Sequence, residues 1–404
     1  MAPLAHSTAG RARRSRPART AVSPDELIRA LGNVDHRRVR LVRAPGRVNL
    51  IGEHTDYNEG FVLPAAIDLE IVIAYVPTDD GRVDLTLLAS GERAMFDFEH
   101  IGPKTGTWID YVAGTAWALR SAGASVHGFR GVLTSTIPSG AGLSSSAALE
   151  LASAWALSGS EPPALAPMAL AQTAQRAENH YVGVMCGLMD QFAATLGVAG
   201  AAVHLDCRTL AWYEVPIPAD LELVVCHSGS PRRLETSAYN ARRADCTRAV
   251  AAIAALEPGV TALRDVDEAM LERSRERMDA VAYQRALHIV TEDERVGATE
   301  AALRDGDLDE VGRLFAASHS SLRDRYEVSS PALDTLVEIA RGVPGVVGAR
   351  LTGAGFGGCT VNLVRRGEAP ALVAAVERDY RARTGLTPHV YAVAAAAGAG
   401  TLER

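Results

Sequence analysis

Lysine is almost absent from this sequence: it occurs once, at Lys104, among 404 residues. A Walker A phosphate loop needs a lysine directly after a glycine, in the pattern GxxxxGK[ST]. Lys104 follows a proline instead, in Gly102-Pro-Lys-Thr, and no glycine stands at the required spacing before it. If this protein handles ATP, it therefore does so without a P-loop.

Cysteines are few, and their spacing does not suggest pairs. There are five, an odd number, with no CxxC, and they lie far apart at positions 186, 207, 226, 246 and 359. Such spacing in a long chain is typical of free thiols in a reducing compartment. We therefore expect a cytoplasmic protein.

Long apolar runs are also missing. A membrane-spanning helix needs about 18 or more apolar residues, and Pro64, Asp68 and Glu70 interrupt the best candidate, 61–76. The net charge of -7 gives no reason to expect nucleic acid. We expect the protein to bind neither a membrane nor nucleic acid. We also expect it to be a monomer.

The size of the chain predicts two domains, because 404 residues exceed what one hydrophobic core usually holds. Residues 1–22, with five arginines and no acid, are interpreted as a disordered tail. A capping box with proline at the first helical position starts the first helix at 23–26. We place one domain at 23–212 and the other at 213–404.

Hydrophobic patterning indicates an α+β fold. Expected strands are 39–43, 66–76, 83–88, 131–136, 201–205, 212–215, 221–226, 346–351, 360–364 and 389–393. Expected helices are 109–119, 145–157, 164–179, 188–196, a long Arg- and Glu-rich stretch from about 234, and 369–383.

Ionisable groups crowd the stretch 43–60, RAPGRVNLIGEHTDYNEG, which begins as strand and ends as turn. Val48, Leu50 and Ile51 separate the charges with apolar side chains. A solvated loop would not need them, so the pattern favours a partly buried polar wall, in which polar groups must be paired. Such a wall suits a sugar pocket.

A glycine turn between a strand and a helix occurs at 137–150, IPSGAGLSSSAALE. Gly140 and Gly142 let the backbone approach a ligand, and the new helix presents its positive end there. Ser144, Ser145 and Ser146 add hydroxyls that can bind phosphate or Mg²⁺. One serine would suffice for a simple N-cap, so we favour a phosphate cradle.

The segment Gly353–Gly358 matches GxGxxG, which raises a dinucleotide-dependent oxidoreductase as an alternative. That fold requires a helix after the glycines. The residues that follow, CTVNLV, are β-branched and typical of a strand. The glycines are therefore better interpreted as a turn against the substrates.

Four further side chains are ambiguous by themselves. Glu178 near one helix end and Asp190 in the first turn of the next could be solvated charges, but apolar neighbours such as Phe192 favour a buried, functional Asp190. Tyr239 could bind sugar and Trp108 could stack on adenine, although both residue types are more often packing residues.

Taken together, the motifs resemble the GHMP small-molecule kinases. Within that superfamily, GRVNLIGEHTDY at 46–57 is similar to the galactokinase signature, and MDQ at 189–191 and SAYNARR at 237–243 also match. The resemblance runs from about residue 25 to the C-terminus. It implies an N-terminal domain like ribosomal protein S5 domain 2, a ferredoxin-like C-terminal domain, and transfer from MgATP to the anomeric hydroxyl of α-D-galactose.

The resemblance also implies roles for residues at matched positions. Asp190 would be the catalytic base and Arg47 its charge-stabilising partner. Mg²⁺ would be held by Ser146 and Glu178. The sugar would be contacted by Glu53, His54, Thr55, Asp56, Gly187 and Tyr239. ATP would be contacted by Trp108, Gly140, Ala141, Gly142, Leu143, Ser144, Ser145 and Ser146.

Two alternatives stay open beside this reading: a galactose sensor on the same fold without transferase activity, and a kinase for a related sugar. A sensor could keep every sugar-binding residue, but we would expect a damaged phosphate loop or a missing base. Both SSSAA at 144–148 and Asp190 are intact, which favours an enzyme.

Overall fold

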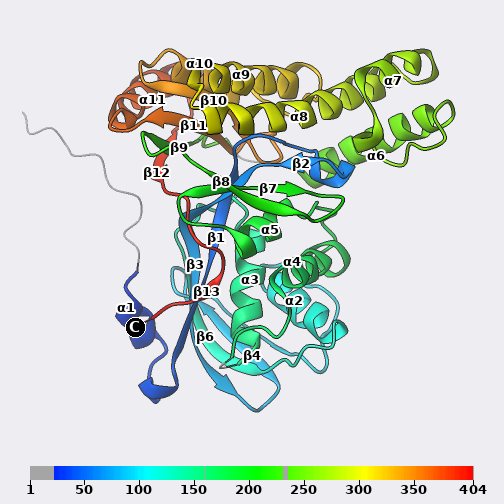
Figure 1. Cartoon of the computed structure of the whole chain (residues 1–404). Coiled ribbons are helices and arrows are strands. Elements are labelled where there is room, and N and C mark those ends of the chain that lie inside the picture. The colour runs from blue at the N-terminus through cyan, green and yellow to red at the C-terminus, as the bar shows by residue number, and fades with distance from the viewer. Residues whose placement is uncertain (1–21, 160, 231–234, 404) are drawn as a thin grey trace, which may run out of the picture.

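The computed structural model describes residues 22–159, 161–230 and 235–403, with 235–237 described by their backbone alone. Residues 1–21, nearly all of the tail expected at 1–22, lie outside that part. The structure contains two large β-sheets, each covered by helices, and they meet near the middle of the molecule (Figure 1). Within the described residues no helix is both long and apolar enough to cross a bilayer.

The N-terminal half is built on a six-stranded sheet of order β13-β1-β3-β6-β4-β5. Its strands are β1 (Arg40–Asn49), β3 (Pro64–Thr78), β4 (Arg82–Leu87), β5 (Arg93–Asp97), β6 (Gly128–Ser135) and β13 (Gly400–Thr401). Strands β1 and β3 pair antiparallel, with a register shift between Pro45 and Arg47. Such irregularities re-aim side chains, and this one lies at the start of the charged motif.

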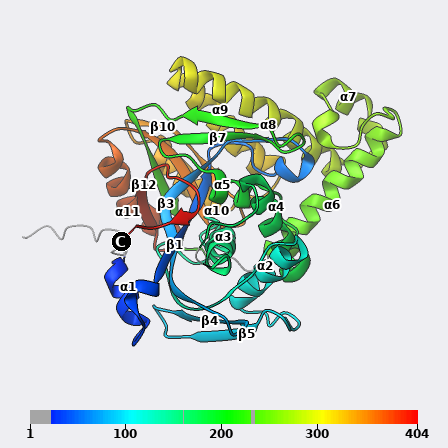
Figure 2. The ribbon, with the colours of Figure 1, turned by 60° about the horizontal axis from the view of Figure 1, so that its bottom comes forward.

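Four helices cover one face of this sheet (Figures 1 and 2). They are α2 (Ile109–Ser121), α3 (Ser145–Leu157), α4 (Pro167–Arg176) and α5 (Met189–Leu196). Helix α4 continues into a π-helical turn, Ala177–Val182, which contains Glu178. A short helix, α1 (Pro24–Ala30), precedes the sheet and is capped by Ser23, whose side chain accepts from the Glu26 amide as the sequence predicted.

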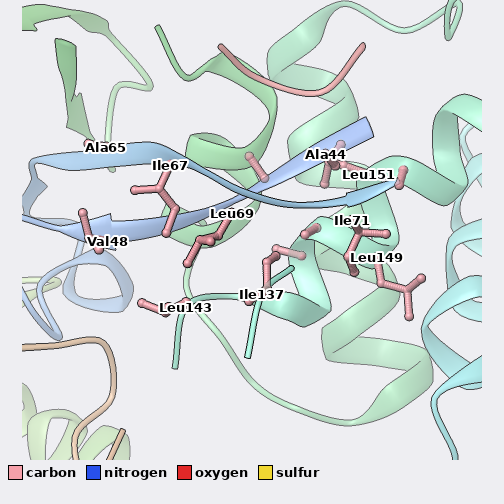
Figure 3. Packing of buried hydrophobic residues seen from close by; sticks show 14 of the residues in the cluster. Ala44, Val48, Ala65, Ile67, Leu69, Ile71, Ile137, Leu143, Leu149 and Leu151 are labelled. Carbon is pink, nitrogen blue, oxygen red and sulfur yellow. The ribbon is translucent and has the colours of Figure 1, made fainter. Parts of the chain in front are cut away.

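Apolar side chains fill the space between β1, β3 and α3 (Figure 3). Val48 and Leu143 belong to this core and are at most 1% exposed, so each contributes about 1.5–3 kcal/mol through burial. Val48 follows Arg47 and Leu143 precedes Ser144. Because side chains alternate along a strand, burial of Val48 directs Arg47 away from the core.

The C-terminal half contains an antiparallel sheet of order β10-β11-β9-β12. Its strands are β9 (Leu221–His227), β10 (Val346–Thr352), β11 (Cys359–Arg365) and β12 (His389–Val393). The helices of this half are α6 (Glu235–Ala254), α7 (Glu268–Arg273), α8 (Ala280–Asp305), α9 (Leu308–Asp324), α10 (Pro331–Arg341) and α11 (Ala369–Thr384). In Figure 1 helices α9 and α10 lie above the sheet and α11 at its left, while α6 and α7 project to the right.

A small three-stranded sheet, β2-β7-β8, lies between the two halves. It consists of Phe61–Val62, Ala201–Asp206 and Trp212–Pro216. The boundary expected at 212/213 falls inside β8, which pairs with β7. At the C-terminus, β13 returns to the N-terminal sheet and pairs with β1, where its backbone groups find partners. The division into 23–212 and 213–404 stays a prediction.

Most expected elements are present with ends shifted by at most three residues, but the strand expected at 39–43 extends to Asn49. The long stretch expected from about 234 contains five α-helices, α6 to α10, of which α6 begins at Glu235; residue 234 lies outside the described part. Strand β5 was missed because its burial pattern shows no clean alternation. The turn 353–358 is followed by strand β11, so the helix needed by a dinucleotide fold does not occur there.

Candidate active site

A cavity of about 270 Å³ lies where the two halves meet. Its walls come from the motif after β1, the start of α3, the π-helical turn, the start of α5, helix α6 and the turn after β10. Most residues named from sequence are therefore brought together. Those that line the cavity are Arg47, Glu53, His54, Asp56, Ser146, Glu178, Gly187, Asp190 and Tyr239.

Arg47 and Asp190 form a bidentate ion pair. Arg47 Nε and Nη2 each donate to one carboxylate oxygen of Asp190 at 2.8 Å, and Nη1 donates to the carbonyl of Gly142 at 2.6 Å. The Ser144 hydroxyl donates to Asp190 Oδ2 at 2.5 Å. The arginine is 5% and the aspartate 23% exposed at the side chain. This geometry fixes the carboxylate while leaving it open to the cavity.

The side chain of Glu53 is much more deeply buried than that of Asp190. Its carboxylate pairs with Arg350 on β10 at 2.5 Å and accepts from the Gly353 amide at 2.9 Å. Burial raises the pKa of Glu53, and Arg350 opposes that shift. Arg350 also lies 3.5 Å from Glu292; burial opposes ionisation of Glu292, but Arg295, His288 and Arg350 lower its pKa to about 2. Two carboxylates thus hold one fully buried arginine.

His54 occupies a left-handed backbone conformation, with φ 67°. Such residues are uncommon outside glycine and cluster at functional sites. Burial lowers the pKa of His54 to about 3, with a further contribution from His288. The ring is therefore neutral at physiological pH and acts through hydrogen bonds.

Asp56 and Gly187 approach each other closely. A Cβ at Gly187 would lie 1.8 Å from Asp56 Oδ2, so only glycine fits there. Asp56 accepts from the Tyr57 amide at 3.0 Å. Burial, with repulsion from Asp190, raises the pKa of Asp56 to about 6. Tyr239 of α6 closes the same part of the cavity.

The glycine turn before α3 has the backbone of an anion cradle. Gly140, Gly142 and Ser144 all have positive φ, between 59° and 73°. In the described part of the chain, no backbone hydrogen bond uses the amides of Gly142, Leu143 or Ser144. These donors lie beside the N-terminus of a 13-residue helix, which favours an anion. Ser144 makes no capping bond, since its hydroxyl is directed to Asp190.

Glu178 and Ser146 lie together on the cavity wall. Burial and the charge of Asp190 raise the pKa of Glu178 to about 7, although hydrogen bonds from Cys186, Ser146 and Gln191 oppose the shift. Hard carboxylate and hydroxyl oxygens suit Mg²⁺, which commonly uses one or two protein oxygens plus phosphate. The described residues contain no cluster of three or more His, Cys, Asp or Glu side chains that could hold a metal alone.

Eight residues named from sequence do not line the cavity: residues 140–145 of the glycine turn, which lie beside it, and Thr55 and Trp108. The Thr55 hydroxyl is buried and bonds to the carbonyls of Gly52 and Phe61, which leaves no side-chain donor for a sugar. Trp108 packs against the N-terminal core and donates from Nε1 to Glu92 at 2.9 Å. The Thr55 hydroxyl and the Trp108 N–H are therefore used within the protein, and substrate contact by these two residues stays a prediction.

Sequence reasoning assigned no role to three residues that support the site: Gln191, Glu150 and Arg350. Gln191 Nε2 donates to Glu178 at 2.6 Å and to Glu150 at 3.0 Å, and so ties the two acids together. Arg350 had one signal in the sequence: a lone arginine in the otherwise uncharged strand VVGARLT needs a buried acid. Nothing in the sequence identifies which acid.

Three family models match the chain. A galactokinase galactose-binding signature covers residues 32–77, a GHMP kinase N-terminal domain covers 110–198, and a GHMP kinase C-terminal domain covers 299–382. A galactokinase of Roseiflexus sp. is 44% identical over 360 residues, 89% of this chain and 92% of that protein. Human galactokinase is 41% identical over 370 residues, with the same coverage.

The chain belongs to the galactokinase family. It is thus a sugar kinase with the two-domain GHMP fold expected from the motifs. Galactokinase from Lactococcus lactis, solved in complex with galactose, superposes with a TM-score of 0.87 at 35% identity, covering 91% of this chain and 96% of that chain. Mevalonate kinase from Methanococcus jannaschii, at 18% identity and a TM-score of 0.63, shares the fold.

Proposed function

We propose that this galactokinase-family chain transfers the terminal phosphoryl group of ATP to the anomeric hydroxyl of α-D-galactose. The carrying observation is the Arg47–Asp190 pair, which faces the cavity between the sugar motif and the glycine turn. The related Lactococcus lactis enzyme was solved with galactose, which supports the choice of sugar.

The sugar is held by Glu53, His54, Asp56, Gly187 and Tyr239. A sugar hydroxyl both donates and accepts hydrogen bonds, so its pocket needs both kinds of partner. Glu53 and Asp56 provide acceptors, and the small residue Gly187 leaves room beside Asp56. The carboxylates are held by protein donors before the sugar arrives, which reduces the ordering cost of binding.

The phosphates of ATP lie on the turn Gly140–Ser146. Its unpaired amides and the N-terminus of α3 attract the negative oxygens. Ser146 and Glu178 would hold Mg²⁺ there. When bound, Mg²⁺ supplies neutralisation of charge on the phosphate oxygens.

Asp190 accepts the proton of the anomeric hydroxyl as the phosphoryl group is transferred. Arg47 holds that carboxylate in a fixed orientation and places positive charge beside the transfer centre. Phosphoryl transfer depends mainly on positioning and on stabilising oxygen charge, and these two side chains provide both. An intact pair of this kind disfavours a sugar sensor without transferase activity.

We further propose a cytoplasmic monomer without membrane or nucleic-acid partners. The five cysteines, all in the described part of the chain, form no disulfide, which suits a reducing compartment. The net charge of -7 disfavours binding to polyanions.

The test is ADP release by the purified chain with MgATP, comparing galactose with glucose, N-acetylgalactosamine, arabinose and mevalonate. Galactose-dependent turnover is expected. Galactose binding without ADP release would make the protein a sensor, and turnover on another acceptor alone would overturn the assignment of the sugar.

A further inference from the structure

Three tyrosines surround the His54 ring. Its centroid lies 5.8 Å from that of Tyr57, 5.7 Å from Tyr239 and 4.7 Å from Tyr326. His54 is 5% exposed. A neutral imidazole carries one N–H, on either Nδ1 or Nε2. Which nitrogen carries it decides whether His54 donates or accepts a hydrogen bond in the cavity.

A chain of hydrogen bonds leads to Nδ1 from behind the cavity. Tyr57 Oη lies 2.8 Å from His54 Nδ1, Tyr326 Oη lies 2.7 Å from Tyr57 Oη, and Cys246 Sγ lies 3.3 Å from Tyr326 Oη. Two proton arrangements satisfy this chain. Either the hydroxyls donate toward the imidazole and Nδ1 accepts, or Nδ1 donates and each hydroxyl donates away from it.

The surroundings of Nε2 favour the first arrangement. Within the described part of the chain, Nε2 is buried and makes no hydrogen bond of good geometry. Ala354 lines the same cavity, and its backbone lies close enough to the ring to raise the pKa of His54 against the larger effect of burial. Because Nε2 has no hydrogen-bond partner among the described residues, it is the ring nitrogen that can meet a ligand in the cavity.

The charged side chains that line the cavity also favour a proton on Nε2. Glu53 and Asp56 line it with carboxylates, which are acceptors when ionised. A sugar hydroxyl that donates its proton to one of these carboxylates can still accept a hydrogen bond through the lone pairs of its oxygen. An N–H on Nε2 meets that need, while a bare Nε2 would compete with the carboxylates for the same proton.

We propose that Tyr57 and Tyr326 are positioning residues that hold His54 with its proton on Nε2, so that the ring donates a hydrogen bond to a hydroxyl oxygen of the bound sugar. Tyr326 donates to Tyr57, and Tyr57 donates to Nδ1. The sugar's identity rests on the proposed function; the position of the proton in the free protein does not.

The direct test is ¹⁵N NMR of the ligand-free protein with ¹⁵N-labelled imidazole rings. A bare ring nitrogen resonates far downfield of a protonated one, so the two tautomers are distinct. The chain has 11 histidines, and the signals lost in His54→Gln assign the ring. We expect a bare Nδ1 and a protonated Nε2 in the wild-type protein at neutral pH. A proton on Nδ1 would overturn the proposal.

Two conservative variants test the chain of hydroxyls. Tyr57→Phe removes the donor to Nδ1, so we expect mixed tautomers, a galactose KM raised about five- to ten-fold, and kcat within about two-fold. Tyr326→Phe leaves Tyr57 in place, and we expect a smaller rise in KM, about two- to three-fold. Unchanged ¹⁵N shifts and KM in Tyr57→Phe would contradict the positioning role.

Tyr75→Phe is the matched control, because Tyr75 is also a buried tyrosine, 2% exposed, whose hydroxyl donates to the Gly159 carbonyl far from the cavity. It should leave the His54 shifts and the KM unchanged. If wild-type protein releases no ADP with galactose, the proposed function fails, while the NMR result still decides the position of the proton.

Discussion

Two arginine–carboxylate pairs place a carboxylate on the wall of the same cavity and differ in how deeply they are buried. Arg350 and Glu53 are 0% and 1% exposed, and Arg350 also donates to backbone carbonyls of the β1 segment, including that of Leu50 at 2.9 Å. Arg47 and Asp190 are 5% and 23% exposed. The sealed pair joins the two halves of the molecule, whereas the open pair leaves its carboxylate accessible to a ligand.

The comparison teaches that similar pairs can serve opposite purposes. A buried pair is costly to break, since the remaining partner is left charged without solvent. A pair at a cavity wall can lose one partner more cheaply, because water or substrate reaches the other. We therefore assign Arg350 to structure and to fixing Glu53, and Asp190 to chemistry.

Asp190→Asn should have the largest effect on turnover. The amide cannot accept the proton of the sugar hydroxyl, so we expect kcat to fall about 10³-fold or more. ADP release with saturating galactose and MgATP measures it. Asp309→Asn, on the exposed start of α9, is the control and should retain normal kcat. Full activity of Asp190→Asn would remove Asp190 from the mechanism.

Arg350→Met should have the largest effect on stability. It leaves Glu53 and Glu292 buried without their shared cation, and we expect a loss of about 3–5 kcal/mol in the free energy of unfolding. Urea unfolding measures it. Arg47→Met is the matched variant: since Asp190 keeps access to solvent, we expect a loss of about 1 kcal/mol. Equal losses would break the distinction between the two pairs.

Glu53→Gln should weaken sugar binding more than it slows transfer. The amide keeps the shape but offers a weaker acceptor and leaves Arg350 without a full counter-charge. We expect the galactose KM to rise about ten-fold or more, with a smaller change in kcat. Steady-state kinetics at saturating MgATP separate the two constants. An unchanged KM would place the sugar elsewhere.

Metal binding should depend on pH in a defined direction. The pKa of Glu178 is raised to about 7, so the side chain is mostly protonated at pH 6 and mostly ionised at pH 8. A carboxylate must lose its proton to bind metal, and we expect the apparent Mg²⁺ affinity to increase about ten-fold between these values. Calorimetry with the ATP-bound protein checks this. A flat profile would exclude Glu178 as the ligand.

The same shift predicts how pH acts on stability without metal. A carboxyl whose folded pKa lies above its ordinary value of 4.5 stabilises the fold fully below pH 4.5, and that contribution is lost as pH rises through about 7. Glu178→Gln should therefore reduce the fall in unfolding free energy between pH 5 and pH 7. Urea titrations at these two pH values measure the difference.

Local chemistry made part of this site predictable from the sequence. The double glycine before three serines predicted a strand–turn–helix cradle, and Asp190 was expected in the first turn of a helix, where the structure has it. The fold class followed from hydrophobic periodicity. Residue roles followed from the resemblance, and they remain predictions.

Long-range pairing was not predictable. Arg350 and Glu53 are far apart in sequence, and only the packing of β10 against the motif after β1 brings them together. The Ser144 hydroxyl could have capped α3, but the left-handed backbone at Ser144 turns it to Asp190 instead. The return of the C-terminus to β1 likewise depends on an open sheet edge that no local pattern reveals.

Calorimetric titration of galactose into Asp190→Asn, without ATP, tests the division between the two pairs most directly. We predict a dissociation constant within about three-fold of the wild-type value, because Glu53 stays clamped by Arg350 and the sugar wall is intact. Loss of galactose binding, by about 100-fold or more, would mean that Asp190 holds the sugar rather than accepting its proton, and would contradict the account.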